Sequence, residues 1–350
     1  MPMNLRQTVL LAAAFAAAAA APSVSAAPGV SPGPGIRYAT DAYPGFDSED
    51  EIVSPAKKTP RWFGWLNGPE KDTAQEQMKY ADDCRREGSL RAARKGYDAL
   101  VRSWPASPEA PLAQKALADL YLGGYLEYEN AFREYRYLLD FYSAQCDYDA
   151  VAAEMYRVAE LMREEGKKMF FLRFANTVDV RRAYEALVLR APGAKFVPAA
   201  MLTIAALRED EERYETAVTV YENLRNLHAG TPEAREAAFR EANARMIILR
   251  KRGYNRSRVN DTLDFLKLVL SNGELDADKR EEVARLLEEV RTHVEEEAFR
   301  AAVFYDSRMR TRRSAISAYE VFLKEYPASV HASEVRKRLS ELQKEAAPNE

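Results

Sequence analysis

The chain has 350 residues, and its 51 Lys and Arg residues nearly balance 54 Asp and Glu residues, for a formal net charge of -3. This balance excludes nucleic-acid binding driven by bulk charge, because phosphate binding needs a concentrated basic surface. The apolar fraction of 47% excludes global disorder. Nineteen Tyr beside three His and two Cys make a composition poor in catalytic side chains. The sequence therefore indicates a protein that is not an enzyme.

Residues 1–26 have the pattern of an export signal. A single charge at Arg6 precedes an uncharged, Ala-rich stretch from Thr8 to Ala21, and Val24 to Ala26 places small residues where a signal peptidase cleaves. The alternative is a membrane anchor, but the apolar stretch is about 14 residues long and a bilayer span needs about 20. We expect cleavage after Ala26 or Ala27.

Residues 27–70 are predicted to be a Pro-rich linker, because proline forbids long helices. The prolines concerned are Pro28, Pro32, Pro34, Pro44, Pro55 and Pro60. The aromatic cluster from Trp62 to Leu66 is the exception within this linker. It either caps the first helices of the following domain or docks a partner.

The two cysteines, Cys84 and Cys146, enter an oxidising compartment if the chain is exported. They either form a disulfide or remain buried single thiols. Neither follows the signal segment, so the sequence contains no lipid-attachment cysteine and predicts no direct lipid anchor.

Residues 71–346 read as helical throughout, and one spacing recurs along them: a small residue, a Tyr four positions later and a Leu or Phe three positions after that. The copies are Ala93-Tyr97-Leu100, Ala131-Tyr135-Leu138, Val180-Tyr184-Leu187, Ala217-Tyr221-Leu224 and Ala315-Tyr319-Phe322, with a weaker one at Thr262-Leu266-Val269. The small residue admits a neighbouring helix closely, and the aromatic one turn later fills the resulting groove.

This spacing resembles the tetratricopeptide repeat, although the copies lie farther apart than the standard unit of about 34 residues. The resemblance implies an all-α, right-handed α-solenoid of five to six degenerate tetratricopeptide helix pairs. A polar helix near Ser333 to Lys344 is expected to cap its end.

A closer resemblance is to the BamD family of outer-membrane assembly factors. It is carried by the phrases Tyr97 to Ser107, Ala110 to Gln114, Ala131 to Leu139 and Phe322 to Pro327. The resemblance implies a scaffold in the periplasm, peripheral to the outer membrane. It also implies two kinds of partner, the central subunit of the barrel-assembly machinery and unfolded outer-membrane protein clients, and no cofactor. A scaffold for envelope division or secretion is the alternative, and a helical envelope enzyme acting on glycans is the alternative from a different class.

A helix-pair solenoid offers a groove lined by the first helix of each pair, suited to an extended peptide or a partner helix. The predicted groove residues are Met78, Asp82, Arg85, Gln114, Tyr121 and Tyr156. Tyr and Arg are favoured at interfaces because they combine apolar area with hydrogen bonding. The alternative is that most of the tyrosines serve packing.

Two further stretches are candidates for contact with a partner. The basic cluster Arg308, Arg310, Arg312 and Arg313 is either a solvated loop or a grip for acidic residues on an assembly partner. The apolar stretch from Lys167 to Phe174 is either a further buried helical turn or an exposed contact site.

No catalytic, cofactor-binding or metal-ligating residue is assigned. His293 is followed by Glu295, Glu296 and Glu297. Successive helical residues point to different sides, so this run predicts a solvated acidic face and no metal site.

Overall fold

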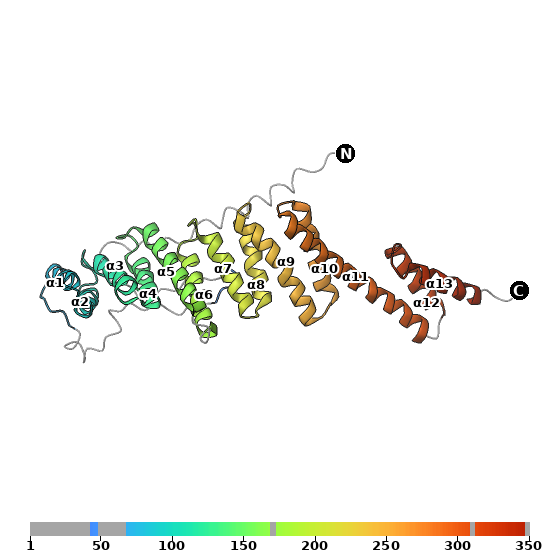
Figure 1. The fold of residues 1–350 in the computed structure, drawn as a ribbon, viewed down its shortest axis with the longest axis horizontal. Helices are drawn as coiled ribbons and strands as arrows, with labels where there is room; N and C mark the ends of the chain where they lie inside the picture. Colours follow the sequence, from blue (N-terminus) through green and yellow to red (C-terminus); the bar gives the residue numbers. More distant parts are fainter. Residues whose placement is uncertain (1–42, 48–67, 169–172, 309–311, 347–350) are drawn as a thin grey trace, which may run out of the picture. The chain divides into compact units, whose positions relative to one another are not determined.

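The computed structural model describes residues 43–47, 68–168, 173–308 and 312–346. Within these residues all regular secondary structure is helical, as thirteen α-helices and one π-helical turn (Figure 1). The predicted all-α fold is confirmed. The signal segment 1–26, the aromatic cluster at 62–66 and most of the linker lie outside the described residues.

The chain divides into two compact units, and the division falls between Leu207 and Arg208. The first unit contains α1 (Ala74–Arg86), α2 (Leu90–Ser103), α3 (Ala110–Leu120), the π-helical turn η3 (Tyr121–Tyr125), α4 (Tyr128–Tyr142), α5 (Tyr148–Lys168), α6 (Arg173–Arg190) and most of α7 (Val197–Asp210). The second contains the end of α7, α8 (Tyr214–Leu227), α9 (Pro232–Arg252), α10 (Arg256–Asn272), α11 (Ala277–Arg308), α12 (Arg312–Glu325) and α13 (Ala332–Ala346).

Within the first unit α1–α2, α3–α4 and α5–α6 form helix pairs, and within the second unit α9–α10 and α11–α12 do, followed by α13. In both units helices that are adjacent in the sequence pack against each other, as α1 does on α2, α3 on α4 and α8 on α9. The repeated positions predicted from the sequence are buried in every copy, and Tyr97, Tyr135, Tyr184 and Tyr221 are at most 1% exposed. The terminal helix α13 buries Val335 and Leu342 and leaves most of its polar residues exposed, as a cap requires.

Small residues set how closely the first two helices approach. A Cβ added to Gly96 on α2 would lie 2.8 Å from the Cβ of Ala81 on α1, which is closer than packed carbon atoms allow. The side chain of Gln77 is buried in the same contact, and its amide nitrogen donates to the Gly96 carbonyl oxygen over 3.1 Å. The α1–α2 contact therefore depends on glycine at position 96.

The second unit has two hydrophobic clusters along one long helix. Val283, Leu286, Leu287 and Val290, in the first half of α11, pack with residues of α9 and α10. Ala302, farther along α11, packs with residues of α12 and α13. Because α11 has 32 residues, it reaches from one cluster to the other (Figure 1).

A buried ion pair connects α4 to α6 in the first unit. The Arg190 guanidinium donates through Nε to Asp140 Oδ1 over 2.8 Å and through a terminal nitrogen to Oδ2 over 3.1 Å. Both side chains are fully buried. A third nitrogen donates to the Ala186 carbonyl, and the Arg190 carbonyl accepts from the Tyr148 hydroxyl. The charges are thus compensated by a hydrogen-bond network, which a buried pair requires.

We predict that Asp140→Ala will lower the free energy of unfolding by about 3–5 kcal/mol, because it leaves the Arg190 guanidinium buried without its carboxylate. Urea unfolding of the full-length protein followed by circular dichroism measures the loss. The double variant Asp140→Leu, Arg190→Met should recover much of it, since neither charge then remains. Glu212→Ala, which removes an exposed partner of Lys251, is the control and should change little. An Asp140→Ala variant as stable as the wild type would show that the pair is dispensable.

Candidate partner-binding site

The face of α1 predicted to line a groove carries Met78, Asp82 and Arg85. Met78 and Asp82 are partly exposed and Arg85 is exposed. Their spacing of four and three residues places them on one side of the helix. The Asp82 carboxylate accepts a hydrogen bond of 2.6 Å from the hydroxyl of Tyr97, the repeat tyrosine of α2. Arg85 lies near the same hydroxyl.

The contact between Tyr97 and Asp82 recurs in other helix pairs. In four of the five tyrosine copies, the hydroxyl on the second helix donates to a carboxylate on the first helix. These tyrosine–carboxylate pairs are Tyr97–Asp82, Tyr135–Asp119, Tyr184–Glu160 and Tyr319–Asp306. The fifth hydroxyl, that of Tyr221, is buried close to Glu209. The repeat tyrosine therefore fills the core with its ring and binds the first helix with its hydroxyl.

Three of these four carboxylates also have a basic neighbour. Lys115 lies 2.9 Å from Asp119, and Arg338 lies 2.8 Å from Asp306. Arg163 pairs with Glu160. The carboxylate side chains keep some exposure, at 29% for Asp119 and 26% for Glu160. Within the first unit, α1, α3 and α5 thus each present a hydrogen-bonding carboxylate to solvent, the kind of group that can accept from the backbone of a bound peptide.

The pKa values of the tyrosines and of Asp306 indicate which partner donates in these hydrogen bonds. Burial raises the pKa of Tyr97, Tyr135 and Tyr184 above the ordinary 10.0, and the hydrogen bond to the carboxylate raises it further. Burial together with the charge of Asp306 raises the pKa of Tyr319 to about 12. The hydrogen bond from Arg338 lowers the pKa of Asp306, and the hydroxyl of Tyr319 adds to this effect. At neutral pH the tyrosine is therefore the donor and the carboxylate the acceptor.

Two predicted groove residues on the second helix pair are buried, which corrects their assignment to an open groove. Gln114 is 1% exposed, and its amide donates to the backbone carbonyl and the carboxylate of Glu134. Tyr121 is 8% exposed, and its hydroxyl accepts from Arg94 over 3.2 Å. Tyr121 begins the π-helical turn η3, which changes the rotation per residue and so shifts the side chains that follow from regular helical spacing.

Tyr156 on α5 is partly buried and packs against other aromatic rings. Its ring is stacked on Phe196 at 4.9 Å between centroids and meets Tyr184 edge-on at 6.2 Å. This contact is that of a packing residue.

Only Arg312 and Arg313 of the predicted basic cluster have side chains in the part of the chain described. The side chain of Arg308 and the whole of Arg310 lie outside the described residues. Arg312 donates to the Glu345 carbonyl over 3.1 Å and so links α12 to α13. Arg313 is exposed and lines a groove between α11 and α12. The structure therefore gives Arg312 and Arg313 different surroundings.

The structure also describes the two cysteines, His293 and the two ends of the apolar stretch. Cys84 is buried, Cys146 is partly buried, and both are free thiols. The His293 ring stacks on Tyr254 at 3.6 Å, and the described residues hold no cluster of His, Cys, Asp or Glu suited to a metal ion. In the apolar stretch from 167 to 174, α5 continues to Lys168 and α6 begins at Arg173. Its central residues, 169–172, lie outside the description.

A contact that sequence analysis missed lies on α6, where the linker residues 43–47 are held. Arg181 is 1% exposed and Glu185 is 2% exposed. Arg181 donates to Glu185 over 2.8 Å and lies 2.9 Å from the Asp47 carboxylate, and the backbone N–H of Asp47 donates to Glu185 over 3.3 Å. We call residues 43–47 the docked segment and Arg181 with Glu185 the α6 ion pair.

The docked segment is a tight turn. The N–H of Phe46 donates to the Tyr43 carbonyl over 3.1 Å, and Gly45 has a φ of 93°, which favours glycine. The rings of Tyr43 and Phe46 stack at 5.2 Å. Burial raises the pKa of the Tyr43 hydroxyl. The sequence feature that could have indicated this contact is the charged pair Arg181 and Glu185. These two residues flank the buried repeat tyrosine Tyr184, where apolar residues would be expected.

No helix in the described part of the chain is both long enough and apolar enough to cross a bilayer.

Comparison with known proteins adds little beyond the geometry. No protein-family model and no curated protein matches the chain. Among solved structures it is similar to a tetratricopeptide repeat protein from Parabacteroides merdae, with 14% identity and a TM-score of 0.28, over 77% of this chain and 98% of that one. It is also similar to PilW, described as a widely conserved type IV pilus biogenesis factor, with 14% identity and a TM-score of 0.26, over 76% of this chain and 99% of that one.

Similarities this low carry no inference about activity or partners. The class of the protein follows from its own helices: it is an all-α solenoid of tetratricopeptide-like helix pairs. The repeated small residue, the buried tyrosine and the tyrosine–carboxylate pairs define that class here.

We predict that Asp306 contributes to stability in a pH-dependent way. Its pKa is lower in the folded protein than the ordinary 3.8, so its contribution is complete above that value and is lost as the pH falls through the lower native value. Asp306→Asn should reduce thermal stability at neutral pH and show a smaller further loss below about pH 4 than the wild type does. Thermal unfolding at a series of pH values measures both effects. Glu288→Gln, which changes an exposed carboxylate in the middle of the same helix, should follow the wild type. The same loss of stability at acid pH in all three proteins would contradict the prediction.

Proposed function

We propose that the protein is a periplasmic scaffold with a role like that of the BamD family. It would bind extended segments of unfolded outer-membrane proteins and the central subunit of the barrel-assembly machinery. The observation that supports this proposal most directly is the docked segment. Five residues without helical structure are held at α6 by contacts that include an ion pair and a backbone hydrogen bond.

The chemistry of the α6 ion pair explains how the docked segment is held there. Arg181 and Glu185 are almost fully buried, and a buried pair is stabilising only when its remaining hydrogen-bonding groups are satisfied. Asp47 supplies a carboxylate to the guanidinium and an N–H to the Glu185 carboxylate. A peptide that offers an acidic residue after a turn can supply the same two groups.

The remaining parts of the proposal rest on the sequence. The export pattern in residues 1–26 supports a periplasmic location, and the resemblance to the BamD family supports the choice of partners. The near-balanced charge of the chain offers no bulk attraction for a client, so recognition would depend on local groups such as the α6 ion pair and the tyrosine–carboxylate pairs.

We predict that the docked segment competes with a peptide added in trans. A labelled synthetic peptide with the sequence of residues 41–50 should bind the Asp47→Ala variant at least about 10-fold more tightly than the wild type, because a tethered competitor acts at a high effective concentration. Fluorescence anisotropy of the peptide gives both dissociation constants.

Asp149→Ala, an exposed aspartate on α5, is the matched control and should bind as the wild type does. A peptide with Asn at the position of Asp47 should bind poorly to all three proteins. Equal affinity of the two peptides for the Asp47→Ala variant would contradict a role for the carboxylate.

The assignment to outer-membrane assembly is tested by affinity purification of the full-length protein from a diderm bacterium, after crosslinking and with mass spectrometry. We expect the barrel-assembly subunit and outer-membrane proteins to be enriched over a purification of an unrelated periplasmic protein. Enrichment of peptidoglycan-associated or secretion proteins in their place would assign the scaffold to division or secretion. Activity of the purified protein on glycan would overturn the scaffold assignment altogether.

A further inference from the structure

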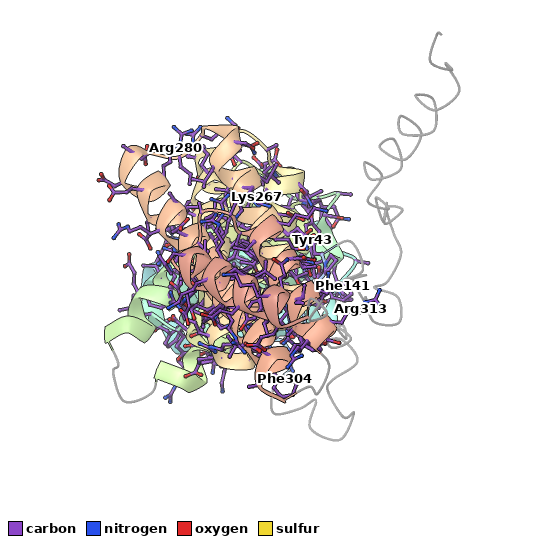
Figure 2. The ribbon with its side chains drawn as sticks, turned by 90° about the vertical axis from the view of Figure 1, so that its right-hand side faces the viewer. Tyr43, Phe141, Lys267, Arg280, Phe304 and Arg313 are labelled. Atoms are coloured by element: carbon purple, nitrogen blue, oxygen red, sulfur yellow. The ribbon has the colours of Figure 1, made fainter. Side chains whose placement is uncertain are left out.

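The end of α11 is apolar on more than one side. Residues 298–305 include a single charged side chain, Arg300. Val303, Phe304 and Tyr305 are 38%, 53% and 39% exposed, and Val321 on α12 is 51% exposed. Phe304 projects outward from this end of the helix (Figure 2). Four of the nine large hydrophobic side chains exposed in the described residues therefore lie on two consecutive helices. A helix that is apolar on several sides is normally covered on those sides.

A groove of about 720 Å³ runs between α11 and α12 beside this patch. Its walls are mostly small residues at helical spacing on both helices: Ala298, Ala301 and Ala302 on α11, and Ser314, Ser317 and Ala318 on α12. Ala302 and Phe322, each 2% exposed, connect the groove to the hydrophobic cluster beneath. Small residues on two neighbouring helices let the backbone of another helix approach closely.

The length of α11 explains why this groove is open. The helices α9 and α10 pack on its first half, where Val290 is the last fully buried residue of their cluster. The groove begins at Ala298 and extends to Tyr305. At 1.5 Å per residue, Ala302 lies about 18 Å farther along the helix than Val290. In the described residues the groove is lined by α11 and α12 alone.

The charges of the groove are arranged so that the groove complements itself. Arg313 and Glu325 both line it, at opposite ends of α12, and both are exposed. Twelve residues of helix separate them, about 18 Å. A twofold axis through the middle of the groove would bring Arg313 of one chain to Glu325 of another, twice. The same operation would place Val321 of each chain opposite Ser317 of the other, so that an exposed large residue meets a small one.

We propose that this groove is a self-association surface, in which a second copy of the chain packs its own α11–α12 pair about a twofold axis. The four helices bury the Val303–Tyr305 patch and Val321, and the paired ends are neutralised by two Arg313–Glu325 contacts. A twofold interface uses one surface patch on both subunits, which is what a self-complementary charge pattern provides. Because the surface is small, we expect a reversible dimer that depends on protein concentration.

Sedimentation velocity of the full-length protein over a range of concentrations tests the proposal. The wild type should form dimers, and Val321→Arg should be monomeric. Arg313→Glu and Glu325→Arg should each raise the dimer dissociation constant at least about 10-fold, since each places like charges opposite one another at two symmetric sites. The double variant R313E/E325R should restore dimerisation, because the exchanged charges again attract.

Matched charge reversals on α13, Lys337→Glu and Glu334→Lys, lie outside the groove lining and should leave the dimer unchanged. Circular dichroism establishes that every variant is folded, which the exposure of Arg313 and Glu325 leads us to expect. A wild type that stays monomeric at about 100 µM would overturn the proposal, given that reversible dimers of small interfaces associate at such concentrations. So would single reversals that the double variant fails to rescue, and so would a monomer that instead binds a different protein through this groove.

Discussion

The structure depends on one repeated interaction, the contact of a second-helix tyrosine with the first helix of its own pair. The ring of Tyr97 fills the space that the small residue Ala93 leaves between the helices, and its hydroxyl donates to Asp82. Burying a hydroxyl without a hydrogen bond costs free energy, and in four of the five tyrosine copies a first-helix carboxylate accepts from the hydroxyl of the deeply buried ring. The interaction therefore fixes how the two helices of a pair lie against each other, and through that which first-helix groups face solvent.

The contacts that could recognise a partner are built on this framework. The α6 ion pair lies on either side of the repeat tyrosine Tyr184, so the packing of that tyrosine also holds Arg181 and Glu185 where the docked segment reaches them. In the second unit, Asp306 on α11 binds Tyr319 on α12 and Arg338 on α13. This charged network therefore holds the three helices together. Packing and recognition thus use neighbouring positions on the same helices.

Departures from the regular repeat are where surface properties change. Tyr121, the first residue of the π-helical turn η3, is buried, and its hydroxyl accepts from Arg94. The part of the long helix α11 that packs on α12 lies beyond the part that packs on α9 and α10. Small residues that line the groove between α11 and α12 are therefore left uncovered by α9 and α10.

The sequence alone determined the fold class and the buried positions, because the spacing of small and aromatic residues is local information that helix geometry converts directly into a packed face. The spacing of Met78, Asp82 and Arg85 in the sequence also placed these three residues on one side of α1. Tertiary structure decided the rest. Gln114 was predicted to be open, but its partner Glu134 lies on the next helix, and the π-helical turn after α3 has no clear mark in the sequence. The Asp47 contact joins groups separated by more than a hundred residues, and no local spacing encodes such a contact. Only the folded chain shows that a segment expected to be linker satisfies a buried ion pair.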